Sequence, residues 1–139
     1  MDALSQAIRH VIERTNQPIV VDGHYSHELI DESLVTLVVI LRRAPWKLQE
    51  TLQNRVYHYE KVLENLDAEI MGVIAGEAEE EYPREKLHEI DTTDISAEEA
   101  ASEIIKVLKG EKPVSFGPID WITYPETLRV LVNRTCTLL

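Results

Sequence analysis

A short apolar run that ends in a carboxylate constrains the fold of this chain more than any other feature. The run is Pro18-Ile-Val-Val-Asp22, and Gly23 and His24 follow it. Valine and isoleucine without polar alternation are typical of a parallel strand that is covered on both faces. Ligands of such sheets bind just beyond the carboxyl ends of the strands. We therefore predict a strand at 19–22 that places Asp22 at a functional edge.

Two further segments are predicted to be strands, the apolar Leu34–Leu41 and the mixed Leu87-His-Glu-Ile90, and each is followed by a charged residue. Strands that alternate with helices form parallel sheets, so the fold class is expected to be α/β. The aromatic tail from Phe116 is expected to pack onto the domain, and 128–132 forms either a strand or a helix. Apolar spacing and capping patterns predict helices at about 3–15, from Ser26, from Pro45, at about 58–80 and after Ser96.

The size and composition of the chain indicate one compact domain. Its 139 residues are 44% hydrophobic, which is enough to bury a core without disulfides. A single cysteine, Cys136, and the lack of a basic and then apolar leader predict a cytoplasmic protein, or a nuclear one in a eukaryote. The stretch Leu34–Leu41 is much shorter than the roughly 20 residues of a membrane span. A transmembrane role is therefore not expected.

The chain is strongly acidic. Its formal net charge is -11, from 25 acidic and 14 basic residues. Such a charge repels nucleic acid and anionic membranes, and it attracts basic proteins, of which ribosomal proteins are the most common. In the alternative interpretation, which we favour for the acidic run 77–81, the carboxylates only form a solvent-exposed charged surface at the end of a helix.

Asp22 and His24 are the first candidates for chemistry. They alternate at a predicted strand end, so their side chains leave on the same side. A single carboxylate is enough to hold Mg²⁺ through its water shell, and the histidine would orient a water or touch a phosphate. Alternatively, Asp22 caps the turn at Ser26 and His24 is an ordinary loop residue. A zinc site made by His24, His27 and Glu28 is less favoured because their spacing lacks the H-E-x-x-H pattern.

A second group of candidates is cationic. Arg42 and Arg43 follow the second predicted strand, and Arg55, His58 and Lys61 flank the junction between two helices. A guanidinium group forms bidentate hydrogen bonds with phosphate oxygens and stabilises the charge that develops during phosphoryl transfer. The cluster therefore predicts a phosphate clamp, that is, a set of cations that holds the phosphates of a nucleotide. The alternative is that Arg43 and Lys47 face solvent and that Lys61 pairs with Glu64 or Asn65 on its own helix.

Six segments of the chain form a recognisable series. They are V-V-D-G-H-Y-S-H at 20–27, V-I-L-R-R-A-P at 39–45, R-V-Y-H-Y-E-K-V-L-E-N-L-D-A-E-I at 55–70, E-A-E at 77–79, H-E-I-D-T-T at 88–93 and I-D-W at 119–121. Together, these motifs resemble the adenylate kinase-like family of eukaryotes and archaea, whose members are kinase/ATPases linked to small-subunit ribosome assembly. The resemblance implies a P-loop NTPase fold with a three-layer parallel sheet, ATP and AMP as substrates, Mg²⁺ as cofactor and a basic small-subunit ribosomal protein as partner.

The resemblance also implies roles for individual residues. Asp22 and His24 match a D-x-H motif that serves Mg²⁺ and the attacking group, and Arg42 matches the arginine that ends the next strand. Arg43 replaces a small polar residue, and Val56 replaces the glycine of an R-G-Y lid motif. The remaining matches are Arg55 and Tyr57 in that lid, Lys61, Asn65 and Glu69 on the helix that leaves it, and Asp91, Thr92 and Thr93 beside the adenine base.

The family's phosphate-binding loop has no counterpart in these 139 residues, because no GxxxxGK[ST] motif occurs. The chain is therefore expected to be an α/β domain at 1–121 without its first βα unit, with a lid at about 43–60 and a C-terminal extension at 122–139. A second polypeptide, a second copy or the segment 128–132 would fill the gap, or the strands would close up. Activity of this chain alone is expected to be weak, and the alternative is a non-catalytic acidic module that binds a basic ribosomal protein.

Overall fold

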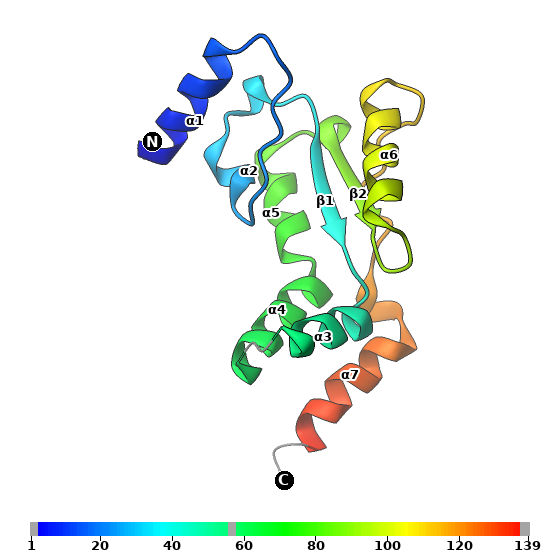
Figure 1. Ribbon diagram of the computed structural model, residues 1–139. Coiled ribbons are helices and arrows are strands. Elements are labelled where there is room, and N and C mark those ends of the chain that lie inside the picture. Colours follow the sequence, from blue (N-terminus) through cyan, green and yellow to red (C-terminus); the bar gives the residue numbers. More distant parts are fainter. Residues whose placement is uncertain (1–2, 56–57, 137–139) are drawn as a thin grey trace.

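The computed structural model describes residues 3–55 and 58–136 and contains a small parallel sheet among helices (Figure 1). Strand β1 (Val38–Arg42) pairs in parallel with β2 (Leu87–Asp91), in a register that sets Val38 opposite Leu87 and Arg42 opposite Asp91. The α/β class and the parallel pairing predicted from the sequence are therefore present. Because the two strands run in parallel, both carboxyl ends lie at the same edge of the sheet.

The predicted strand at 19–22 is wrong. These residues form no regular secondary structure, and in the described part of the chain only β1 and β2 form a sheet. The side chain of Val20 is 92% exposed and that of Ile19 is 40% exposed. An apolar run becomes a strand only where a neighbouring strand accepts its hydrogen bonds, and β2 is the one partner of β1 in the described residues.

The other two strand predictions fare better. The prediction at 87–91 is confirmed, and the one at 34–41 is confirmed in part, because β1 begins at Val38. A one-turn helix, η1 (Glu32–Leu34), precedes it, and the carboxylate of Asp31 accepts the backbone N–H of Ser33 at its start. This local hydrogen bond favours a turn over an extended backbone at 32–34, so the strand begins only after the turn.

One hydrophobic core lies between the sheet and helix α5 (Val73–Glu81). Ile40 and Leu87 from the strands pack with Ala78 and Tyr82 from the end of this helix. The hydroxyl of Tyr82 donates to the carbonyl oxygens of His27 (3.0 Å) and Ile30 (2.6 Å), and so fastens helix α2 (Ser26–Leu29) to the core. Helix α1 (Ala3–Arg14) lies at the outer end of this region (Figure 1).

A second hydrophobic core holds three helices together below the sheet (Figure 1). These helices are α3 (Pro45–Asn54), α4 (Tyr59–Met71) and α7 (Pro125–Cys136). The buried residues of this core are Leu52 from α3, Val62 and Leu66 from α4, and Val130 from α7. The segment 128–132, which sequence left undecided between strand and helix, is thus helical, and it packs on the domain.

Gly72 divides the single helix predicted at about 58–80 into α4 and α5. Its φ of 64° is left-handed, a conformation that ends a helix and favours glycine. The N–H of Gly72 donates to Glu69 O at 3.1 Å, which closes the last turn of α4. The break lets α4 join the lower core while α5 covers the sheet.

The capping box predicted at Ser96 and Glu99 is present and starts α6 (Ala97–Leu108). β2 connects with this helix through His88, which is fully buried. Its Nδ1 accepts the N–H of Ser115 at 2.9 Å, so Nε2 carries the proton and donates to Glu103 at 2.9 Å. No helix of the described residues is both long and apolar enough to cross a membrane.

Candidate functional site

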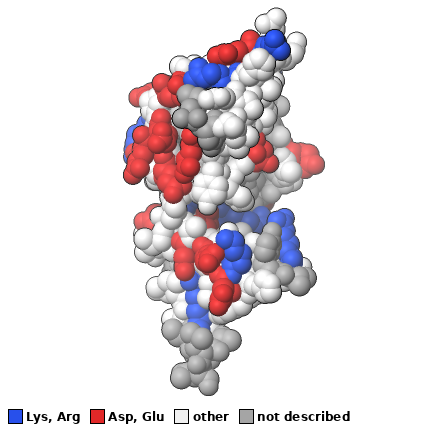
Figure 2. Space-filling model, turned by 90° about the vertical axis from the view of Figure 1, so that its left-hand side faces the viewer, with Lys and Arg blue, Asp and Glu red and all other residues white. Residues whose placement is uncertain are grey.

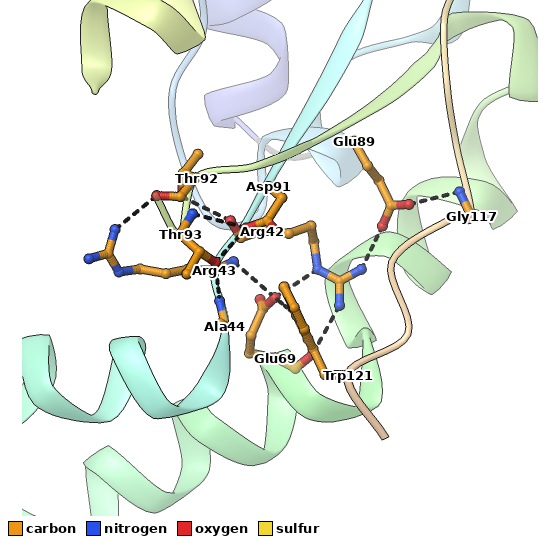
Figure 3. Close-up of polar contacts among 10 residues, drawn as sticks. All are labelled: Arg42, Arg43, Ala44, Glu69, Glu89, Asp91, Thr92, Thr93, Gly117 and Trp121. Atoms are coloured by element: carbon orange, nitrogen blue, oxygen red, sulfur yellow. Dashed lines mark hydrogen bonds and ion pairs between the residues drawn. The ribbon is translucent and has the colours of Figure 1, made fainter. Parts of the chain in front are cut away.

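The carboxyl ends of β1 and β2 carry the densest polar network that the structure describes (Figure 3). At its centre is Arg42, the last residue of β1, whose side chain is only 4% exposed. Its guanidinium contacts Glu69 on α4 and Glu89 on β2, and Trp121 from the tail after Gly110 donates to the same Glu69 carboxylate. The network therefore joins parts of the chain that are far apart in sequence.

Two carboxylates neutralise Arg42. Its Nε donates to Glu69 Oε1 at 2.8 Å, its Nη1 to Glu89 Oε1 at 2.5 Å, and its Nη2 to the carbonyl of Glu69 at 3.0 Å. Burial disfavours the charged guanidinium, but Glu69 and Glu89 together outweigh that cost and raise the pKa of Arg42 above its ordinary value. Arg42 is thus a permanent buried cation with its charge already balanced.

Both carboxylates are also held by donors from elsewhere. Glu69 Oε1 accepts the backbone N–H of Arg43 (3.2 Å) and the indole N–H of Trp121 (2.6 Å), and Glu89 Oε2 accepts the N–H of Gly117 (2.7 Å). Every partner adds a hydrogen bond to an ion, which lowers the cost of burying the charges. As a result, the tail at 115–121 is hydrogen-bonded to both carboxylates that hold Arg42 at the end of β1.

The loop after β2 lies against the loop after β1. Thr92 donates from its N–H (2.8 Å) and hydroxyl (2.9 Å) to Arg42 O, while Ala44 N–H donates to the Thr93 hydroxyl at 2.9 Å. That hydroxyl in turn donates to Asp91 Oδ1 at 2.5 Å. Arg43 Nη1 donates to Thr92 O at 3.1 Å, and its Nε is buried with no hydrogen-bond partner in the described residues. Five residues predicted from sequence therefore meet here: Arg42, Arg43, Asp91, Thr92 and Thr93.

Asp22 and His24 lie apart from this network, in the loop before α2. Both are exposed, and neither forms a hydrogen bond or ion pair with the residues that the structure describes. The alternative in which Asp22 caps the turn is wrong, because the N–H and hydroxyl of Ser26 donate to Gly23 O instead. Their assignment to Mg²⁺ and the attacking group stays a prediction.

The lid candidates lie on the hairpin of α3 and α4. Arg55 is exposed at the end of α3, and Lys61 on α4 pairs with Glu64 at 2.9 Å, as the alternative interpretation of that residue expects. Asn65 Nδ2 donates to the carbonyl of Lys61 at 2.7 Å. Tyr57 lies outside the described residues. A phosphate-binding role for these side chains also stays a prediction.

Sequence reasoning missed how the site is held together. Gly117 carried no expected role, and Glu69, Glu89 and Trp121 were only matched to motifs. A glutamate inside the predicted strand 87–91 was the one available signal, because a carboxylate buried there requires a cationic partner. The identity of that partner depends on the register that brings Arg42 beside β2.

Comparison with known proteins gives the chain relatives in archaea. No family model matches the chain. It is 37% identical to a protein of Thermococcus onnurineus over 121 residues (87% of this chain, 63% of the relative), and 42% identical to one of Thermococcus gammatolerans over 103 residues (74% and 55%). A protein of Methanocaldococcus jannaschii is 37% identical over 110 residues (79% and 56%), and all three are named "Putative adenylate kinase". These relatives support an adenylate kinase-like family.

The chain spans between 55% and 63% of the length of these three relatives. The small parallel sheet and its polar carboxyl edge are compatible with an adenylate kinase-like fold. Chemically, the edge offers hydroxyl groups, backbone groups and one arginine with an unpaired Nε, all on a framework that the buried ion pairs hold in place.

Proposed function

We propose that the chain is part of, or derives from, an adenylate kinase-like phosphotransferase, in which Mg²⁺-ATP donates its γ-phosphoryl group to AMP or to water. The observation that carries this proposal is the similarity of 37–42% to adenylate kinase-like relatives over about three quarters or more of the chain. We further propose the P-loop NTPase architecture, with a domain at 1–121, a lid at about 43–60 and an extension at 122–139.

In this proposal Asp22 holds Mg²⁺ through water, and His24 orients the attacking group. The donor set is suitable, because Asp22 is an exposed carboxylate with no partner in the described residues, and Mg²⁺ usually takes one or two carboxylates and keeps several waters. When bound, Mg²⁺ would neutralise negative charge on the phosphates of the nucleotide.

The remaining roles concern the nucleotide itself. The phosphate oxygens would be contacted by Arg43, Arg55, Tyr57, Lys61 and Asn65. The adenine base would lie beside Asp91, Thr92 and Thr93. Arg42 would reach a phosphate only by releasing a carboxylate, because Glu69 and Glu89 occupy its guanidinium. Its proposed contribution is therefore mainly to position the strand ends.

The 139 residues contain no phosphate-loop motif, and this limits the activity that we expect of them on their own. Each preorganised donor to a transferring group contributes about 3 kcal/mol, so the absence of several raises the barrier by roughly 6–10 kcal/mol. That corresponds to a rate loss of about 10⁴-fold or more. We expect the isolated chain to bind nucleotide weakly and to turn it over very slowly.

The test is formation of ADP from ATP and AMP, measured for the chain alone and with a separately supplied phosphate-loop segment of an archaeal relative. We expect activity only in the mixture, and a loss of about 100-fold or more in Asp22→Asn. Glu85→Gln is the matched control, because it removes one exposed carboxylate that lies just before the amino end of β2, opposite the carboxyl edge of the sheet. Absence of activity in the mixture, or equal activity in Asp22→Asn, contradicts the enzyme proposal.

A second candidate is an acidic module that binds a basic small-subunit ribosomal protein and acts in small-subunit maturation. The net charge of -11 favours it, and Figure 2 shows acidic side chains gathered on the upper half of one face. We expect salt-sensitive association with such a protein that Asp22→Asn leaves intact. Association that is equal in low and high salt contradicts this candidate.

A further inference from the structure

Helices α2 and α5 face each other across three potential metal ligands that belong to neither proposed function. These are His27 and Glu28 on α2 and Glu77 on α5, and one ligand atom from each lies within 4.8 Å of the others. His27 is 6% exposed, Glu77 is half-buried and Glu28 is exposed. The cluster thus has a buried inner side and an open outer side.

Two atoms of this cluster are buried without a hydrogen bond. His27 Nε2 lies 3.2 Å from Glu77 Oε2, yet the pair lacks hydrogen-bond geometry, and neither atom has another hydrogen-bond partner in the described residues. A buried polar atom without a partner is destabilising, because it loses its hydrogen bonds to water and gains none in the protein. The two atoms lie close together but are not aligned for a hydrogen bond, and a cation bound by both would satisfy them.

We propose that His27, Glu28 and Glu77 bind one divalent transition metal ion of the zinc type. An imidazole with two carboxylates is a borderline donor set that suits Zn²⁺ better than Mg²⁺. Bonds of about 2.0–2.1 Å in a tetrahedron separate ligand atoms by about 3.3 Å. The observed 3.2 Å between His27 Nε2 and Glu77 Oε2 matches that separation.

The surroundings also favour a cation. His27 and Glu28 line a cavity of about 250 Å³ that carries three more carboxylates, those of Asp31, Glu32 and Glu81. Two of them already have a cationic partner, because Asp31 lies 3.3 Å from Arg9 and Glu32 pairs with Lys86. Glu81 has no ion pair in the described residues, so it is the carboxylate left to attract a further cation. With three protein ligands, the fourth position of the ion would open toward this cavity and accept water or a small anion.

A protonated His27 that simply pairs with Glu77 is the competing explanation. Such a pair explains the short distance, but a proton on Nε2 would then be buried without the hydrogen bond that normally holds it. A metal ion accepts one lone pair from each atom and lies off the line that joins them, so the two atoms need not be aligned with each other. It would also fasten α2, which follows the loop of Asp22 and His24, to the helix that covers the sheet.

Binding of Zn²⁺ to the full chain, measured by equilibrium dialysis with elemental analysis, tests the site, and Co²⁺ absorption reports the ligand geometry. We expect one equivalent of Zn²⁺ and visible Co²⁺ bands with the intensity of a tetrahedral site. Glu77→Gln and His27→Asn are each expected to weaken binding by at least about tenfold. Circular dichroism of each variant without metal shows whether it folds.

Two variants serve as matched controls. Glu80→Gln changes an exposed carboxylate of the same helix, and His24→Gln removes the neighbouring histidine, so both are expected to bind Zn²⁺ like the unaltered chain. If His27→Asn fails to fold, the half-buried Glu77 still decides the matter. The proposal is overturned if no stoichiometric binding occurs, if Glu77→Gln binds normally, or if only His24→Gln loses the metal.

Discussion

The strand ends at Arg42 and the segment 19–24 were both expected to form the functional edge of the sheet, but they differ in burial and in the number of their partners. At the strand ends, buried charges are satisfied by partners from four parts of the chain. In the loop, Val20 is 92% exposed and Asp22 has no partner in the described residues. One region is fixed by tertiary contacts, and the other is fixed mainly by its own backbone.

This difference shows that each segment takes its predicted place only when its partners are present. An apolar run needs an adjacent strand, and a buried charge needs an opposite charge. The apolar run 19–21 has no strand beside it in the described residues, so it gains little from burial. The polar residues at the strand ends find their partners within the described chain. The following predictions test this contrast.

The largest effect is expected for Arg42→Met. This change leaves the carboxylates of Glu69 and Glu89 without their buried cation, which typically costs about 3–5 kcal/mol of unfolding free energy. Urea denaturation measures the loss. Arg55→Met is the matched control, because that arginine is exposed and its replacement is expected to change stability by less than about 0.5 kcal/mol. Equal effects of the two changes would mean that the network contributes no stability.

A smaller effect is expected for Gly72→Ala at the break between α4 and α5. A left-handed φ of 64° costs an alanine about 1–2 kcal/mol, although its Cβ would meet the nearest atom, Arg42 Nη2, at an ordinary 3.6 Å. Gly76→Ala, inside α5 with open space around it, is expected to stabilise the protein by about 0.5–1 kcal/mol. Thermal denaturation distinguishes the two signs. A stabilising Gly72→Ala would show that the helix runs unbroken.

The smallest effect is expected for Val20→Ala in the exposed loop. Because this side chain is 92% exposed, its truncation is expected to change the unfolding free energy by less than about 0.5 kcal/mol. Ile40→Ala, in β1 and 5% exposed, is the matched control and is expected to cost about 2–5 kcal/mol. A large loss for Val20→Ala would mean that the run 19–21 is buried in solution and would restore the predicted strand.

Local patterns predicted the elements well where the signal lies within a few residues. The helix at about 3–15, the start at Pro45, the strand 87–91 and the capping box at Ser96 are all present. The break at Gly72 was missed because the apolar spacing of the helix continues across it. For the candidate site, the sequence placed Arg42 and Thr92 near one strand edge, but it did not show which groups would bind them.

By itself, the sequence determined the local helices, the parallel α/β class and the resemblance to adenylate kinase-like proteins, because these depend on side-chain periodicity and on motifs within short windows. Only the tertiary structure decided that Arg42 is buried between Glu69 and Glu89, that 19–21 stays outside the sheet, and that His27 faces Glu77. The physical reason is that the burial of a charge, the pairing of a strand and the meeting of ligand atoms all depend on residues far apart in the chain.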